Sequence, residues 1–357
     1  MCLLAWVLAV PMHSIWHMTK KDNDQKGPID RLREGAGSLE VKTPDDDSAI
    51  TGMISHGDSL LVVKEKGVYA IKLADQIDPE RENINAPNTI QRILPYGSSE
   101  PWVGATLLTG SELLKKEILN EHVDTERAMS LVVEIAQNIA GALELLNAIN
   151  SSQTIELEKY DLKIKKDRSV MLPSIMGLAN KCKEFLQKSD HALDSLFKVV
   201  KVFYPNVGKG GWESLRKEVE KESPSIDNFK EVLSQILPFL LFVRNARNCV
   251  EHPRNEHRII VTDFSVDANN NLLPPLIEVV HPKTPQAAVP VVNLMRHVID
   301  NIIDTVEVML AFLCNRHIRL IDGLPVQVYE FPIDQRRIEN VKYGYGVAME
   351  NTIIRFG

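Results

Sequence analysis

The chain has 357 residues, 44% of them hydrophobic and 25% charged, a balance that excludes collagen-like and wholly disordered proteins and is typical of a globular protein. Its 41 Lys and Arg against 48 Asp and Glu give a net charge of −7, which excludes a chain-wide basic surface for binding nucleic acid. The four cysteines lie far apart, without the spacing of metal ligands, so we expect no zinc site, no disulfide framework and no cofactor.

The N-terminal segment, residues 1 to 48, is predicted to be a leader. Residues 1 to 12 are apolar, but no Lys or Arg precedes them, and they are too few to span a bilayer, so they make a poor signal peptide. Met18 is followed by a polar stretch, which suggests that the true start lies there. We expect a flexible leader over residues 1 to 48, no membrane partner and a cytoplasmic protein.

Residues 49 to 110 are predicted to form a small β-rich domain. Two β-prone runs, at 60 to 63 and 68 to 73, are separated by a Glu-Lys-Gly turn, which indicates a hairpin. Four prolines between residues 79 and 101 prevent a long helix before about residue 111.

Residues 111 to 317 are predicted to be mainly helical. Apolar residues recur at helical spacing, and Asp124 is a suitable N-cap for the first long helix. The expected helices cover residues 127 to 149, 174 to 204 with a break near Ser189, 212 to 221, 226 to 251 with a kink at Pro238, and 290 to 313. A hairpin is predicted near residues 258 to 280, and residues 318 to 357 are predicted as a β-rich extension.

The segment from Arg244 to Arg258 carries the clearest chemistry. Arg244 and Arg247 end the apolar part of a predicted helix, and a guanidinium beside a core needs an anion or several hydrogen bonds. Four arginines against two glutamates give this segment a local charge of +2. The sequence therefore predicts an anion-binding site here.

The six residues from Arg247 to His252, Arg-Asn-Cys-Val-Glu-His, resemble the Arg-polar-x3-His signature of the HEPN superfamily. The resemblance implies a mainly α fold in which residues 111 to 317 form a four-to-five-helix bundle. The hairpin near 258 to 280 would be an insertion, and small β-rich elements at both ends would make the whole chain α+β.

Many HEPN proteins are metal-independent endoribonucleases of toxin and antiviral systems that cut RNA by attack of its 2′-OH. The resemblance implies that His252 is a general acid or base, that Arg247 faces the phosphate and that Asn248 orients either group. Arg244, Arg254 and His257 would bind RNA. Two motifs commonly meet across a homodimer, and a neutralising antitoxin or regulatory partner would be expected.

Non-catalytic interpretations remain open for the same residues. Arg and His in the last turn of a helix are favoured by the helix dipole, and Arg247 can pair with Glu251 one turn away. The chain would then be a dimerisation or regulatory module, or would bind RNA or a nucleotide without cleaving it. An exposed cleft shared by Arg247 and His252 would favour catalysis, whereas pairing with Glu251 would favour a structural role.

Overall fold

The computed structural model describes residues 27–34, 41, 46–160, 163–208, 210–221, 228–321, 323–349 and 352–356. The chain divides into two compact units, one of residues 1–41 and 72–89 and the other of residues 42–71 and 90–357. The predicted apolar stretch at 1–12 and the start at Met18 lie outside the described residues.

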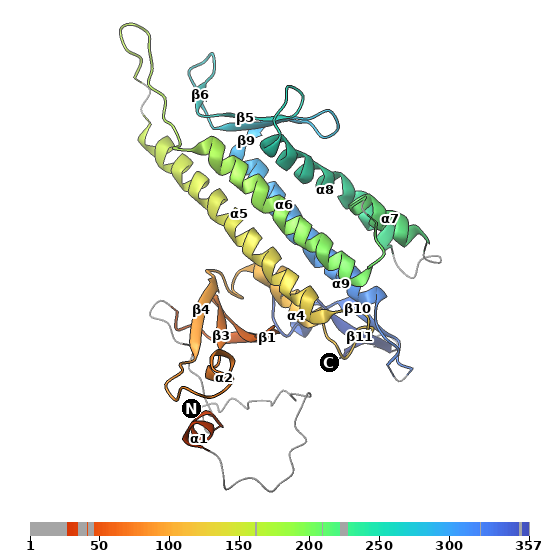
Figure 1. Cartoon of the computed structure of the whole chain (residues 1–357). Helices are drawn as coiled ribbons and strands as arrows, with labels where there is room; N and C mark the ends of the chain where they lie inside the picture. The colour runs from red at the N-terminus through yellow and green to blue at the C-terminus, as the bar shows by residue number, and fades with distance from the viewer. Residues whose placement is uncertain are drawn as a thin grey trace. The chain divides into compact units, whose positions relative to one another are not determined.

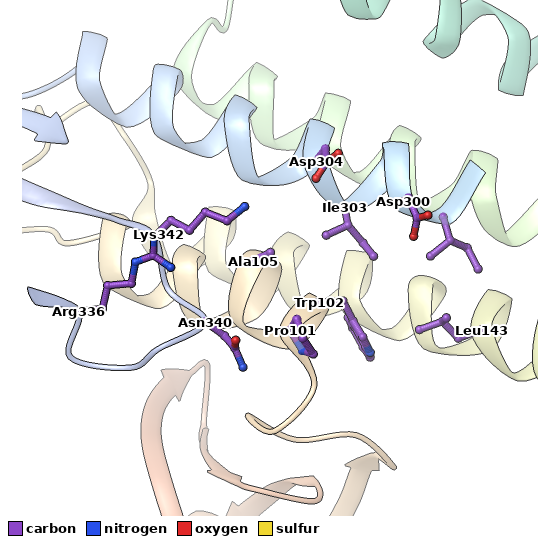
Figure 2. A pocket seen from close by; sticks show the side chains of 11 residues that line it. Pro101, Trp102, Ala105, Leu143, Asp300, Ile303, Asp304, Arg336, Asn340 and Lys342 are labelled. Atoms are coloured by element: carbon purple, nitrogen blue, oxygen red, sulfur yellow. The ribbon is translucent and has the colours of Figure 1, made fainter. Parts of the chain in front are cut away.

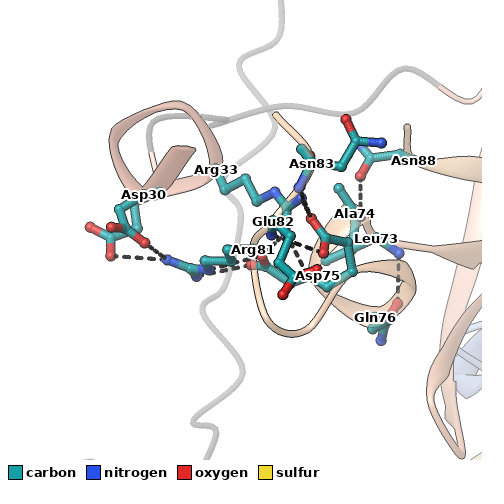
Figure 3. Close-up of polar contacts among 12 residues, drawn as sticks. Asp30, Arg33, Leu73, Ala74, Asp75, Gln76, Arg81, Glu82, Asn83 and Asn88 are labelled. Atoms are coloured by element: carbon teal, nitrogen blue, oxygen red, sulfur yellow. Dashed lines mark hydrogen bonds and ion pairs between the residues drawn. The ribbon is translucent and has the colours of Figure 1, made fainter. Parts of the chain in front are cut away.

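The smaller unit is held together by ion pairs (Figure 3). Its helices are α1 (Pro28–Glu34) and α2 (Ala74–Ile77). Arg33 Nη1 lies 2.8 Å from an oxygen of Asp75, and Arg81 Nη2 lies 3.1 Å from the other oxygen of the same carboxylate. These pairs lower the pKa of Asp75, chiefly through the Arg33 hydrogen bond. Part of the segment expected to be a flexible leader is therefore helical and anchored to residues 72–89.

A four-stranded sheet follows in the order β1-β2-β3-β4. Its strands are β1 (Ile50–His56), β2 (Ser59–Lys64), β3 (Val68–Lys72) and β4 (Thr89–Leu94). Val63 pairs with Val68 in an antiparallel ladder, so the hairpin predicted around residues 65 to 67 is confirmed. Both residues are fully buried, because this face of the sheet packs into the main core.

The helices of the larger unit lie between residues 101 and 316. They are α3 (Pro101–Val103), the π-helical turn η1 (Gly104–Leu108), α4 (Thr109–Leu113), α5 (Thr125–Lys159), α6 (Leu178–Phe203), α7 (Trp212–Lys221), α8 (Phe229–Glu251) and α9 (Val291–Arg316). Asp124 caps α5 by accepting the Arg127 N–H at 2.9 Å, as predicted.

Two local predictions about helices are wrong. The segment from residue 101 to residue 113 is helical, because Pro101 occupies the first helical position, where its missing N–H costs nothing. α6 continues through Ser189, whose hydroxyl donates to the carbonyl oxygen of Phe185 at 2.8 Å within the helix. The hydroxyl is thereby satisfied without a break in the buried face of α6.

α5 and α6 lie side by side along much of their length, and α6 also packs against α8 and α9 (Figure 1). α5 is long and apolar enough to cross a membrane, but half of its apolar window is buried within the protein. A core helix passes the same test, so this is weak evidence for a membrane span.

Three further sheets complete the fold, with strand orders β5-β8-β9, β6-β7 and β10-β11-β12. Their strands are β5 (Arg258–Thr262), β6 (Ser265–Val266), β7 (Leu272–Leu273), β8 (Leu276–Val280), β9 (Gln286–Pro290), β10 (Val326–Glu330), β11 (Tyr343–Met349) and β12 (Thr352–Arg355). The antiparallel pairing of β5 with β8 confirms the hairpin predicted near residues 258 to 280.

The expected fold class, a mainly α protein centred on a HEPN-like helix bundle, is wrong. The protein is 48% helix and 21% strand, with four separate small sheets, and is an α+β fold. The strands belong to the core: Tyr345 of β11 is fully buried, and its hydroxyl donates to the carbonyl oxygen of Leu113 at 2.6 Å. The prediction failed because strands expected to lie outside the helical bundle contribute buried side chains to the core.

Candidate functional site

The C-terminal end of α8 carries the Arg-Asn-x3-His motif. The helix ends at Glu251, and the His252 N–H still donates to the carbonyl oxygen of Asn248 at 2.9 Å. Pro253 follows, which disfavours a further helical turn. Cys249 faces inward with its thiol 3.6 Å from the Val280 carbonyl oxygen, and burial raises its pKa. Cys249 is thus a packing residue.

Arg247 is held by two carboxylates. Its Nη1 lies 2.8 Å from Oε2 of Glu251, and its Nε lies 3.4 Å from Oδ2 of Asp190 on α6. Nη1 also reaches Oδ1 of Asn248 at 3.4 Å. The Arg247 side chain is 28% exposed, so a solvent-borne anion can reach it. In this arrangement, however, such an anion competes with Glu251.

Asp190 is the deeper of these two acidic partners. Its side chain is 19% exposed, and burial raises its pKa, whereas the charge of Arg247 lowers it by a smaller amount. The free energy that the charged carboxylate loses by desolvation is larger than the free energy that it gains from one ion pair at 3.4 Å. Asp190 therefore favours its protonated form more than an exposed aspartate does.

Beside Arg247 lies a cavity of about 450 Å³, here named the α6–α8 cavity. Residues of α6, α8 and the segment before α7 line it, and they include three cations and two acids: Lys201, Arg244, Arg247, Asp190 and Asp194. Asn248 and the paired aromatic rings of Phe197 and Trp212, with centroids 4.9 Å apart, also line it. Cations, acids and aromatic rings together suit a nucleotide, whose phosphate, hydroxyls and base need different partners.

The glycine-rich segment before α7 forms part of the same wall. Gly208 and Gly211 line the cavity, and Gly211 has a φ of +65°, which favours glycine. A Cβ at Gly211 would lie 3.1 Å from Nη1 of Arg244. The glycine thus lets the segment approach Arg244 closely.

The six predicted site residues divide into two groups. Arg244, Arg247 and Asn248 line the α6–α8 cavity, whereas His252, Arg254 and His257 are not among the residues that line it. His252 is exposed, directly after the helix. Arg247 and His252 of one chain therefore do not both line the α6–α8 cavity.

Arg254 and His257 form a tight turn after the motif. Each backbone N–H donates to the carbonyl oxygen of the other residue, at 2.8 and 3.0 Å. The ring of His257 lies 4.9 Å from the ring of His281, and burial together with His257 and Lys283 lowers the pKa of His281. These residues follow Arg247 in the sequence, as His252 does, and they form a second group of polar residues that does not line the α6–α8 cavity.

Sequence reasoning missed the α6 side of the cavity. Asp190, Asp194 and Lys201 recur at helical spacing on one face. Charged residues on an amphipathic helix, however, usually indicate only a face that is exposed to solvent. Nothing in the sequence pairs that face with α8. Within the described ranges, no group of three or more His, Cys, Asp or Glu side chains is placed to hold a metal ion.

Comparisons with known proteins identify no relative: no family model, no curated protein and no solved structure matches the chain.

Proposed function

We propose that this protein is a cytoplasmic, metal-independent endoribonuclease that acts as a homodimer, with Arg247 and His252 as its central residues. The observation that carries the proposal is the placement of the motif. Arg247 lines a cavity with two further cations, Lys201 and Arg244, while His252 is exposed at the end of the same helix. Arg247 of one copy and His252 of another would form a complete site.

The reaction needs only groups that these side chains provide. An imidazole takes the proton from the ribose 2′-OH, whose oxygen then attacks the adjacent phosphorus. The bond from phosphorus to the 5′ oxygen breaks, and that oxygen leaves with the proton that the imidazole took up. Arg247 stabilises the charge on the phosphoryl oxygens, and Asn248 orients the phosphate. The products are a 2′,3′-cyclic phosphate and a 5′-hydroxyl end.

The RNA would extend from the cavity across the surface beyond α8. Arg244 is exposed at the cavity, and Arg254 is exposed in the turn after the motif. His257 lies beside Arg254 in the same turn. An acidic chain with a small basic region is suited to local recognition of RNA rather than tight non-specific binding. A neutralising antitoxin or another regulatory partner would act by covering this region.

A second candidate function is supported by the ion pairs of Arg247. With Glu251 at 2.8 Å and Asp190 at 3.4 Å, the guanidinium already has two acidic partners, and only its buried Nε makes no hydrogen bond among the described residues. In this alternative the chain is a dimerisation or regulatory module, or it holds a nucleotide in the α6–α8 cavity without cleaving anything.

Cleavage of purified RNA in the presence of EDTA separates the two functions. We expect wild type to leave 2′,3′-cyclic phosphate ends and His252→Ala and Arg247→Ala to lose at least about a hundredfold in rate. His297→Ala is the matched control, because His297 is an exposed histidine on α9 that does not line the α6–α8 cavity. Loss in all three variants, or equal cutting by folded His252→Ala, would contradict the nuclease proposal.

A further inference from the structure

A cavity of about 540 Å³ lies in the larger unit between α5, α9 and the segment from residue 336 to residue 342 (Figure 2). Its cation Lys342 already interacts within the protein, because its Nζ lies 2.7 Å from Oε2 of Glu307. That hydrogen bond is the main cause that raises the pKa of Lys342, and the charge of Asp304 contributes less. The charge of Lys342 is thus offset by protein groups. The turn that follows β8 differs, because its contacts permit only one charge state of a histidine.

The turn between β8 and β9 is built around His281. Residues 281 to 285 have the sequence His-Pro-Lys-Thr-Pro, and a proline has no backbone N–H. Lys283 and Thr284 therefore carry the only backbone N–H groups from residue 282 to residue 285. Both of these groups donate to Nδ1 of His281 at 3.2 Å. We name residues 281 to 284 the His281 turn.

The hydrogen bonds of the His281 turn require a neutral imidazole. A ring nitrogen accepts a hydrogen bond only while it carries no proton, so Nδ1 is the unprotonated nitrogen and Nε2 carries the hydrogen. Protonation would place a hydrogen on Nδ1, opposite two backbone N–H groups that can only donate. The closed turn and the charged imidazolium therefore exclude each other.

Thr284 joins the His281 turn to the helix that carries the motif. Its Oγ1 lies 3.2 Å from Nδ1 of His281 and accepts a hydrogen bond from Nδ2 of Asn245 at 3.2 Å. Asn245 belongs to α8 and precedes Arg247 by two residues. An opening of the His281 turn would therefore remove a contact of α8 beside the candidate site.

The surroundings of His281 also oppose a positive charge. Burial is the main cause that lowers the pKa of His281, and the charges of His257 and Lys283 lower it further. The ring of His257 lies 4.9 Å away. Of the other elements packed here, β5 carries the cation Arg258, and α8 carries Cys249, whose thiol stays neutral because burial raises its pKa. His281 is thus neutral at pH 7 and becomes half protonated only below its usual value of 6.5.

We propose that the His281 turn is a pH switch attached to α8. At neutral pH, the imidazole holds the N–H groups of Lys283 and Thr284 and, through the Thr284 hydroxyl, the side chain of Asn245. In mild acid, a proton on Nδ1 removes the acceptor, the turn opens and the contact between Thr284 and Asn245 is lost. The closed turn binds a proton less readily than the open turn, so its stability is full above pH 6.5 and falls as the pH decreases. The switch is independent of the proposed ribonuclease function.

Hydrogen exchange of backbone amides, measured by NMR on the full chain, tests this inference. The protection of the Lys283 and Thr284 amides is corrected for the pH dependence of exchange in an unstructured peptide. We expect this protection to fall by at least about fivefold between pH 7.5 and pH 5 in the wild type. The side-chain amide signals of Asn245 should shift over the same pH range.

His281→Asn separates the acceptor from the proton. The Asn side-chain oxygen can accept from the same two N–H groups, but it does not titrate, so this variant should keep the protection at both pH values. His281→Ala has no acceptor and should show weak protection at both. His297→Asn is the matched control, because His297 is an exposed histidine on α9 that contacts Asn301 of its own helix. It should keep the wild-type pH dependence.

The inference is overturned if the wild-type amides are equally protected at both pH values, if His281→Asn loses protection in acid as the wild type does, or if His281→Ala keeps the pH dependence. Circular dichroism follows the helix content of each protein over the same pH range. A parallel loss of helix content would also overturn the inference, because the turn would then open only with the whole fold. These measurements contain no RNA, so their result does not depend on whether the chain cleaves RNA.

Discussion

Arg247 and Glu251 form an ion pair of 2.8 Å between Nη1 and Oε2 across one turn of α8. The two side chains are 28% and 27% exposed, so the pair is partly screened by water. Such a pair contributes little to folding, about 0 to 1 kcal/mol. Its larger effect is on ligands, because Glu251 places a negative charge where a phosphate would approach Arg247.

Glu251→Gln should therefore strengthen binding of an RNA oligonucleotide while changing the free energy of unfolding by less than about 1 kcal/mol. Fluorescence anisotropy measures the affinity, and urea denaturation measures the stability. Glu256→Gln is the control, because Glu256 is an exposed acid in the same segment and its loss gives the same change in net charge. Equal affinities for the two variants would show that Glu251 does not oppose phosphate binding.

Mixing two inactive variants tests whether the site is shared between copies. If Arg247 of one chain acts with His252 of another, a dimer of Arg247→Ala with His252→Ala contains one intact site and one doubly altered site. An equimolar mixture that exchanges subunits should recover on the order of a quarter of wild-type cleavage, since half of its dimers are mixed and each has one of two sites. No recovery, despite mixed dimers detected by native mass spectrometry, would place both residues of a site in one chain.

The raised pKa of Asp190 predicts a pH-dependent effect of Asp190→Asn. Because burial raises the folded-state pKa above the usual 3.8, the folded state binds more protons than the unfolded state just above that pH. The wild type therefore loses stability as the pH rises through this interval, and the variant does not. The free energy of unfolding of Asp190→Asn relative to wild type should increase with pH in urea titrations from pH 3 to pH 7. A decrease would mean that the ion pair with Arg247 outweighs burial.

Asp46 should show the opposite dependence. Burial favours a higher pKa, but hydrogen bonds from Ser48 and Tyr69, with the charge of Lys64, lower the pKa of Asp46 to about 2. Its stabilisation is present above the unfolded value of 3.8 and is lost as the pH falls toward 2. Asp46→Asn should cost about 1 to 2 kcal/mol at pH 7. That difference from wild type should shrink in acid, and a constant difference would argue against a charge effect.

Two helical glycines should respond in opposite directions to alanine. At Gly104 the added Cβ would lie 2.4 Å from Cβ of Asn340, whereas at Gly141 of α5 it would lie 3.5 Å from the flexible side chain of Lys188. Gly104→Ala should lose about 1 to 3 kcal/mol of stability through overpacking, and Gly141→Ala should gain up to about 1 kcal/mol through helix propensity. Thermal unfolding of both variants measures the difference. Similar shifts would mean that the chain at Asn340 relaxes freely.

Local patterns determined many elements of this protein. The hairpin of β2 and β3, the cap of α5 at Asp124 and the bounds of α7 follow from signals within a few residues. Turn residues, side-chain caps and apolar spacing depend on residues close together in the sequence, so the elements they specify can be predicted without knowledge of the rest of the chain. The same is true of the motif at the end of α8.

Only the tertiary structure decided how distant segments meet. The fold class depends on strands that complete the core, as Tyr345 does against Leu113. The candidate site depends on α6, which brings Asp190 to Arg247 and leaves His252 outside the α6–α8 cavity. Helical spacing shows which residues share a face, but the partner of that face is set by packing of the whole chain, where burial and long-range ion pairs compete.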